Sequence, residues 1–157
     1  MSHEIIEVTP KPKPRAGFGV LLMKNGKILL GHRNDDAEKA SSYLHGEGTW
    51  TMPGGSLKFQ EDLKEAALRE VLEETGIFLK SEDLKIVSVT NDRVSDNHFV
   101  TIGWACKEVP NNQEPRVMEP DEITEWKWFD IKELPKPLYK SSEKLLNNYL
   151  DGEIYKN

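Results

Sequence analysis

The alternation of apolar and polar residues predicts a chain in which strands and helices are mixed. Apolar runs bounded by turn residues indicate strands, and Asn25-Gly26 between two such runs is typical of a tight hairpin. We find no internal repeat and no long run of βαβ units, so we expect one domain. The expected strands are Arg15–Lys24, Lys27–Gly31, the short stretch Trp50–Met52, Leu84–Thr90, Phe99–Glu108 (after the polar Asn91–Asn97) and Ile123–Phe129.

Two helices are expected from composition and end signals. Glu61–Thr75 is rich in Leu, Ala, Glu and Lys, which favour helix, and Gly76 follows as a C-cap. Ser141–Leu150 is expected to close the domain, with Ser141 or Ser142 as its N-cap.

The remaining segments are predicted to be a tail and loops. Met1–Pro14 is polar and punctuated by proline, so we expect an N-terminal tail or edge segment before a domain that covers residues 15–157. Asp35–Thr49 is rich in Asp, Ser and Gly, and it is long enough to contact a substrate. Val109–Asp121 contains three prolines and is also expected to be a loop.

The composition of the chain narrows the classes of molecule that we expect it to bind. The 157-residue chain has a formal net charge of −6, and its clear basic run is Lys11–Arg15, so we expect no polymeric nucleic acid partner. The single cysteine, Cys106, follows an apolar run and is expected in the core. No stretch approaches transmembrane length, and Met1–Val8 lacks the pattern of a signal peptide. We therefore expect a cytoplasmic protein with no membrane partner.

Three glutamates gather at the end of the first predicted helix. Glu70, Glu73 and Glu74 are spaced so that they fall on one helical face. Like charges at these spacings cost a few tenths of a kcal/mol per pair, and carboxylates in the last turn oppose the helix dipole, at roughly 0.3–1 kcal/mol each. Arg69 can relieve part of this by pairing with Glu73. Such a concentration of unfavourable choices indicates a functional site, although a solvated acidic face is an equal alternative from the glutamates alone.

A divalent cation would reverse the sign of this repulsion. The donors are all carboxylate oxygens, with no convergent His or Cys, and this set suits Mg²⁺, with Mn²⁺ as a possible substitute. Because Mg²⁺ usually shares its ligand shell with substrate phosphates, the acidic face predicts a phosphate-bearing substrate.

The residues from Gly55 to Ile77 resemble the Nudix box, G-x5-E-x7-R-E-U-x-E-E-x-G-U, where U is a bulky aliphatic residue. Every fixed position matches. Trp50–Gly55 is similar to the usual lead-in of the family, and His98–Ile102 and Glu119–Glu122 are similar to its MutT-related branch, which hydrolyses nucleoside triphosphates. The resemblance implies an α/β protein: an α/β/α sandwich with a central mixed β-sheet in a single Nudix domain, with the box at residues 55–77.

The resemblance also implies roles for the residues of the box and its lead-in. Glutamates matching Glu70 and Glu74 ligate the metal, the one matching Glu73 ligates or supports it, and the carbonyl of the glycine matching Gly54 is a further ligand. Glu70 is also a candidate for the base that activates water. The arginine matching Arg69 orients a carboxylate.

Within the box, the resemblance assigns tuning of the site to the glutamate matching Glu61, and we place Glu61 and Gly55 beside the substrate. Members of the family often place another carboxylate on a distant loop, and we favour Glu119 over Asp121 and Glu122 as that catalytic group.

Two further candidates come from the residues themselves. Arg33 at the end of a strand can hold a phosphate, with a solvated strand end as the alternative. Trp50 can stack on a base, although packing in the core explains it equally well. His45 and His98 are expected to be ordinary polar residues.

The leading hypothesis is therefore an Mg²⁺-dependent pyrophosphohydrolase that cleaves a nucleoside triphosphate, modified or oxidised forms included, to a nucleoside monophosphate and pyrophosphate. ADP-ribose, nucleotide sugars and dinucleoside polyphosphates remain open as substrates. A Nudix-fold sensor that binds a nucleotide without cleaving it is the alternative of another class, and the complete box argues against it. A homodimer is expected by analogy with the MutT-related branch.

Overall fold

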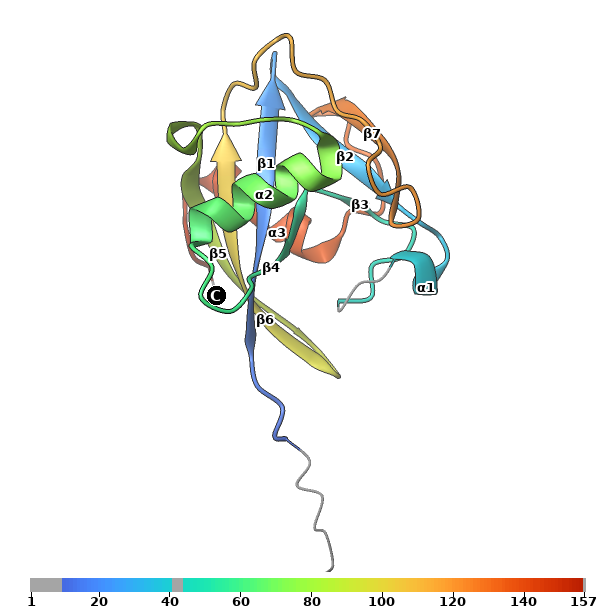
Figure 1. The fold of residues 1–157 in the computed structure, drawn as a ribbon, viewed down its shortest axis with the longest axis vertical. Helices are drawn as coiled ribbons and strands as arrows, with labels where there is room; N and C mark the ends of the chain where they lie inside the picture. The colour runs from blue at the N-terminus through green and yellow to red at the C-terminus, as the bar shows by residue number, and fades with distance from the viewer. Residues whose placement is uncertain (1–9, 41–43, 157) are drawn as a thin grey trace, which may run out of the picture.

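A mixed sheet built around β1 (Arg15–Lys24) forms the centre of the computed structural model, which describes residues 10–40 and 44–156 (Figure 1). β1 pairs in parallel with β6 (Asn97–Cys106) and antiparallel with β2 (Lys27–Arg33). The other strands are antiparallel to their neighbours: β3 (Trp50–Thr51) and β7 (Ile123–Asp130) lie beside β2, β4 (Gly54–Ser56) beside β1, and β5 (Lys85–Val94) beside β6. The described residues thus form a seven-stranded sheet.

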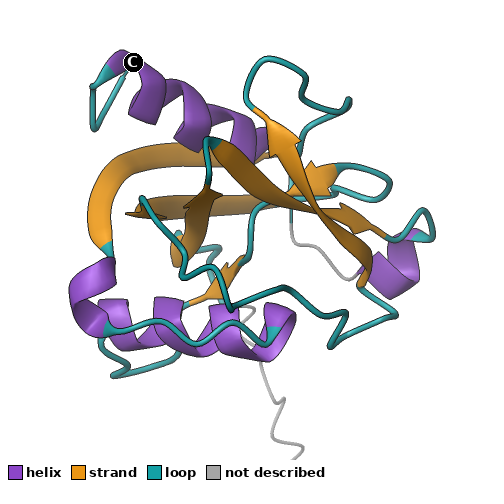
Figure 2. Cartoon of the chain, turned by 90° about the horizontal axis from the view of Figure 1, so that it is seen from above, coloured by secondary structure: helices purple, strands orange, loops and turns teal. Residues whose placement is uncertain are grey.

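Helices cover both faces of this sheet. α2 (Leu63–Thr75) lies on one face and α3 (Lys140–Asp151) on the other, as Figure 2 shows from above. Two short helices, α1 (Ala37–Ala40) and the 3₁₀ turn η1 (Ser81–Asp83), lie in the connections. The expected α/β/α sandwich around a mixed sheet, in one domain, is confirmed. Among the described residues, no helix is both long and apolar enough to cross a membrane.

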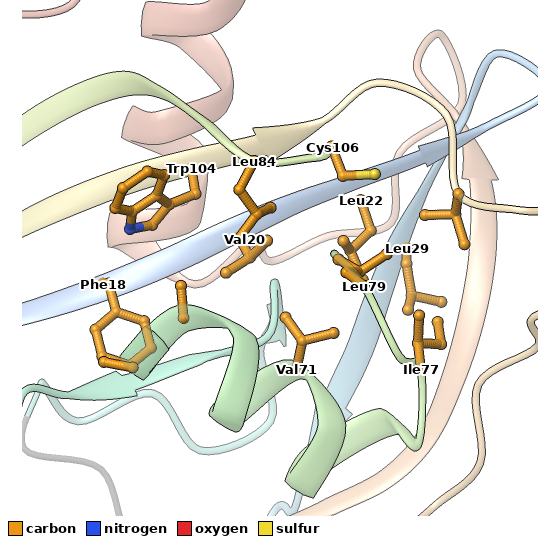
Figure 3. Packing of buried hydrophobic residues seen from close by; sticks show 13 residues of the cluster. Phe18, Val20, Leu22, Leu29, Val71, Ile77, Leu79, Leu84, Trp104 and Cys106 are labelled. Atoms are coloured by element: carbon orange, nitrogen blue, oxygen red, sulfur yellow. The ribbon is translucent and has the colours of Figure 1, made fainter. Parts of the chain in front are cut away.

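The core has two parts, one under each helix, because successive side chains of β1 point to opposite faces. Val20 and Leu22 pack toward α2, with Val71 of that helix (Figure 3). Leu21 packs toward α3, against Leu145. Cys106 is buried in the first part, as expected.

The β5–β6 hairpin is longer than the sequence predicts. We expected strands to end at Thr90 and resume at Phe99, but pairing continues to Val94 and Asn97, so that only Ser95 and Asp96 form the turn. Polar side chains do not prevent this, because the strand pairing is made by the backbone.

Both main helices begin at residues other than those predicted. α2 starts after Asp62, whose carboxylate accepts the amides of Lys64 and Glu65, so Glu61 lies before the helix. α3 starts after Tyr139, and neither predicted serine caps it. Ser142 is instead buried in the first turn, where its hydroxyl accepts the amide of Met52.

Parts of two predicted segments lie outside the described residues. Residues 1–9 of the expected tail and residues 41–43 of the expected loop Asp35–Thr49 are not described. The rest of that loop contains α1.

Candidate active site

The last two turns of α2 present glutamates to a cavity of about 320 Å³. Ala66, Ala67 and Val71 are fully buried on the helix face that packs against the sheet, which turns Glu70, Glu73 and Glu74 toward the cavity. Gly76 ends the helix in a left-handed conformation (φ 74°), and its amide donates to Leu72. The sequence prediction that the three glutamates share a face is consistent with this geometry.

Arg69 bonds to carboxylates on both sides of it. Its Nε and Nη2 donate to the two oxygens of Glu61, at 2.7 and 3.0 Å. Its Nη1 donates to Glu70 Oε1 at 2.8 Å and to Glu73 Oε2 at 3.2 Å. The hydrogen bond from Arg69 lowers the pKa of Glu61, and the carboxylates raise the pKa of Arg69. Arg69 is therefore a cation held among three carboxylates, one of which is Glu70.

Glu70 and Glu74 are carboxylates whose surroundings disfavour the charged form. Burial raises the pKa of Glu70, against the lowering effect of Arg69. Burial, followed by the charge of Glu70, raises the pKa of Glu74 well above its usual value. The amide of Gly54 donates to Glu74 at 3.2 Å and opposes this rise of the pKa only in part.

Two glycines allow the lead-in strand to lie against these carboxylates. A Cβ on Gly54 would come within 2.2 Å of the Phe18 carbonyl oxygen. A Cβ on Gly55 would lie 2.9 Å from the Glu70 carboxyl group. A side chain at either position would push β4 away from β1 or displace Glu70.

A second group of carboxylates reaches the same cavity from the loop before β7. Glu119 and Glu122 both line it, whereas Asp121 is exposed and does not. Burial and the neighbouring Glu122 raise the pKa of Glu119. The sequence analysis named Glu119, Asp121 and Glu122 as candidates and favoured Glu119, and the structure places Glu122 at the cavity beside it. We call Glu70, Glu73, Glu74, Glu119 and Glu122 the carboxylate wall.

The carboxylate wall fits a hard divalent cation by the chemistry of its donors. Five carboxylates face one cavity, and the repulsion seen at Glu70 and Glu74 would be offset by a bound cation. Within residues 10–40 and 44–156, no three of these groups are already gathered as a ligand cluster. Arg69 bonds to both Glu70 and Glu73. Mg²⁺ usually completes its shell of ligands with water and substrate phosphate oxygens.

Arg33 and Trp50, two further predicted residues, have different positions. Arg33 lines the cavity, with its guanidinium 5.2 Å from the ring of Tyr139 and a hydrogen bond to the Ala40 carbonyl. Trp50 does not line the cavity. It packs edge-on between His32 and Phe129, with ring centroids 4.9 and 5.0 Å away, which is the packing role that the sequence left as an alternative.

The other wall of the cavity was not predicted. Leu44, Phe99 and Tyr139, which we call the apolar wall, line it from three separate segments of the chain. No local spacing marks these residues as neighbours, because only the folded sheet and α3 bring them together.

Comparison with known proteins identifies the family to which this fold belongs. Residues 13–149 match the NUDIX domain, and the chain belongs to the Nudix family. It is a Nudix hydrolase, as the box predicted.

Similar curated proteins include an ADP-ribose pyrophosphatase of Methanocaldococcus jannaschii, 28% identical over 87% of this chain and 73% of its own. An oxidized purine nucleoside triphosphate hydrolase of Danio rerio is 28% identical over 74% of this chain and 66% of its own.

Among solved structures, the chain is similar to a MutT Nudix hydrolase of Burkholderia pseudomallei, with a TM-score of 0.74 and 30% identity, covering 87% of this chain and 98% of that one. A Francisella tularensis NMN adenylyltransferase/ADP-ribose pyrophosphatase, solved with AMP and a manganese ion, shares the fold. Its TM-score is 0.69 at 22% identity, over 91% of this chain and 43% of that one.

Proposed function

We propose that this Nudix hydrolase is an Mg²⁺-dependent pyrophosphohydrolase that cleaves a nucleoside triphosphate, modified or oxidised forms included, to a nucleoside monophosphate and pyrophosphate. The observation that carries the proposal is that the carboxylate wall and the apolar wall line the same cavity. The first wall suits a metal and phosphates, and the second suits the flat ring of a nucleoside.

The protein's own residues hold the metal in this proposal. Glu70, Glu73 and Glu74 supply carboxylate oxygens, and the Gly54 carbonyl is a further ligand. When bound, Mg²⁺ neutralises phosphate charge and lowers the pKa of a bound water, and Mn²⁺ is a substitute, as the manganese in the Francisella tularensis relative supports.

Proton transfer falls to a carboxylate with a raised pKa. Glu70 and Glu119 both line the cavity, and burial raises the pKa of each. A base whose pKa approaches the working pH takes a proton from water more effectively than an ordinary surface carboxylate. Arg69 holds Glu70 in place and is in turn held by Glu61. Glu119 is the second candidate for the base.

Arg33 and Gly55 contact the substrate in this proposal. Arg33 is a cation on the cavity surface that can bond a phosphate. Gly55 also lines the cavity, and its lack of a side chain leaves space for the Glu70 carboxyl group. For Trp50, the packing against His32 and Phe129 favours a supporting role. The homodimer, the cytoplasmic location and the division at residue 15 stay predictions.

The experiment is a substrate panel with Mg²⁺, in which products are separated by ion exchange. Release of pyrophosphate and a nucleoside monophosphate from triphosphates would support the proposal. ADP-ribose is the second candidate substrate, because the Methanocaldococcus jannaschii relative is named for it. Activity on ADP-ribose alone, or release of orthophosphate from triphosphates, would overturn the proposal.

A further inference from the structure

A loop and a hairpin meet beside the cavity. Leu44 lines the cavity from the loop, and Phe99 lines it from the β5–β6 hairpin. One residue after Leu44, His45 Nε2 lies 2.9 and 3.0 Å from the two carboxylate oxygens of Asp96, in the turn of the hairpin. Hydrogen bonding to His45 lowers the pKa of Asp96. The contact therefore links the loop that carries Leu44 to the hairpin that carries Phe99, through two residues that are 51 positions apart in the chain.

The other side of the loop is fixed by close packing. A Cβ on Gly46 would lie 2.4 Å from the ring of Tyr139, so the backbone lies directly on that ring. Thr49 Oγ1 donates to the Gly46 carbonyl at 2.6 Å, and the Gly48 amide donates to Asn34 at 3.1 Å. The two residues that follow Leu44 are thus held, His45 by its contact with Asp96 and Gly46 by its packing on Tyr139.

The backbone at His45 is in the left-handed region, with φ 57°. Residues other than glycine seldom adopt this conformation, and His, Asn and Asp tolerate it best. Asn is therefore a replacement that keeps the backbone and has too short a side chain to keep the contact.

We propose that His45 and Asp96 form a positioning pair that holds Leu44 against the cavity and so determines how tightly the nucleoside part of the substrate binds. The pair acts through the apolar wall and leaves the carboxylate wall untouched. The inference rests on the proposed function, since it requires a substrate with a nucleoside.

The experiment is steady-state kinetics of the intact protein with Mg²⁺ and the most rapidly hydrolysed of the four common deoxynucleoside triphosphates. His45→Asn and Asp96→Ala each remove the contact and are expected to raise KM about twofold to fivefold, the range for an exposed polar contact, with kcat unchanged. The double variant is expected to be no worse than either single variant, because both remove one contact. His98→Asn is the matched control, since His98 lies on the same hairpin but contacts Asn91.

A second probe separates nucleoside binding from phosphate binding. Tripolyphosphate, which has no nucleoside, is expected to inhibit the parent and both variants with the same inhibition constant. An unchanged KM, additive effects in the double variant, or an equal fall of kcat would overturn the inference alone. Absence of triphosphate hydrolysis by the parent protein would overturn the proposed function and, with it, this inference.

Discussion

Lys24 and Glu74 are two charged side chains with little access to water, and the groups that surround their charges are opposite in kind. Lys24, at the end of β1, is only 7% exposed. Its ammonium donates to the carbonyls of Asn111 and Gln113, at 3.1 and 2.7 Å, and to the Glu114 carboxylate at 2.6 Å. Every proton of this amine has an acceptor, and its charge has a partner.

Glu74, at the end of α2, has the reverse surroundings. Among the described residues it accepts the amide of Gly54, and the charged groups that shift its pKa are the carboxylates Glu70, Glu119 and Glu122, which all raise it. Burying a charge without a partner is costly, and a protein keeps such a group where function needs it. The difference indicates that Lys24 serves stability, by fastening the loop 109–116 to the sheet, and it supports the proposal that Glu74 serves chemistry.

The largest effect that we expect from this difference is a loss of turnover when Glu74 is replaced. Glu74→Gln keeps the shape of the side chain but removes a proposed metal ligand, so we expect kcat to fall by about a hundredfold or more. Release of pyrophosphate at saturating Mg²⁺ measures it. Glu65→Gln, an exposed glutamate in the first turn of the same helix, is the control. Equal activity of the two variants would contradict the role of Glu74.

The two side chains also differ in how far the sequence predicts their neighbours in the fold. Glu70, Glu73 and Glu74 lie within one helix, where spacing alone decides which side chains share a face. The acceptors of Lys24 are 87 to 90 residues away, and nothing near Lys24 marks them.

The other predictions also succeeded where the pattern is local and failed where the contact is tertiary. The sandwich and the box followed from local patterns and from the resemblance they carry. The Glu61–Arg69 pair was missed because Glu61 was placed inside the helix, whereas Asp62 caps it and leaves Glu61 free to turn back. The apolar wall was missed because its residues come from segments joined only by tertiary packing.

The next largest effect that we expect is a loss of stability when Lys24 is replaced. Lys24→Met keeps the apolar stem but removes three hydrogen bonds and the contact with the ring of Trp128, so we expect the free energy of unfolding to fall by about 2–3 kcal/mol. Urea denaturation measures the change. Lys27→Met, at the exposed start of β2, is the control. If both variants were equally stable, the loop would not depend on Lys24.

A smaller effect is expected at the partner of Arg69. Glu61→Gln loses the paired charge that holds the guanidinium, so Arg69 is free to follow Glu70 and Glu73 more closely. Groups that hydrogen-bond to metal ligands affect activity by orienting those ligands. We therefore expect kcat to fall by roughly tenfold. A titration of activity against Mg²⁺ separates this from loss of metal, and an unchanged kcat would show that Arg69 needs no second anchor.

The smallest effect concerns stability without metal. Because the pKa of Glu74 is raised in the folded protein, the folded state binds a proton there more tightly than the unfolded state. The glutamate thus costs no stability at pH values below its ordinary unfolded pKa, and it destabilises the fold increasingly as pH rises through the folded pKa.

Glu74→Gln removes this cost, so in chelator-treated protein we expect the variant to be more stable than the parent at pH 8 and equal to it near pH 4. Thermal unfolding across this range measures the difference. Saturating Mg²⁺ at pH 8 should reverse it, since the cation stabilises the parent more than the variant. A parent that is the more stable form at pH 8 without metal would mean that Glu74, like Lys24, is already satisfied by the fold.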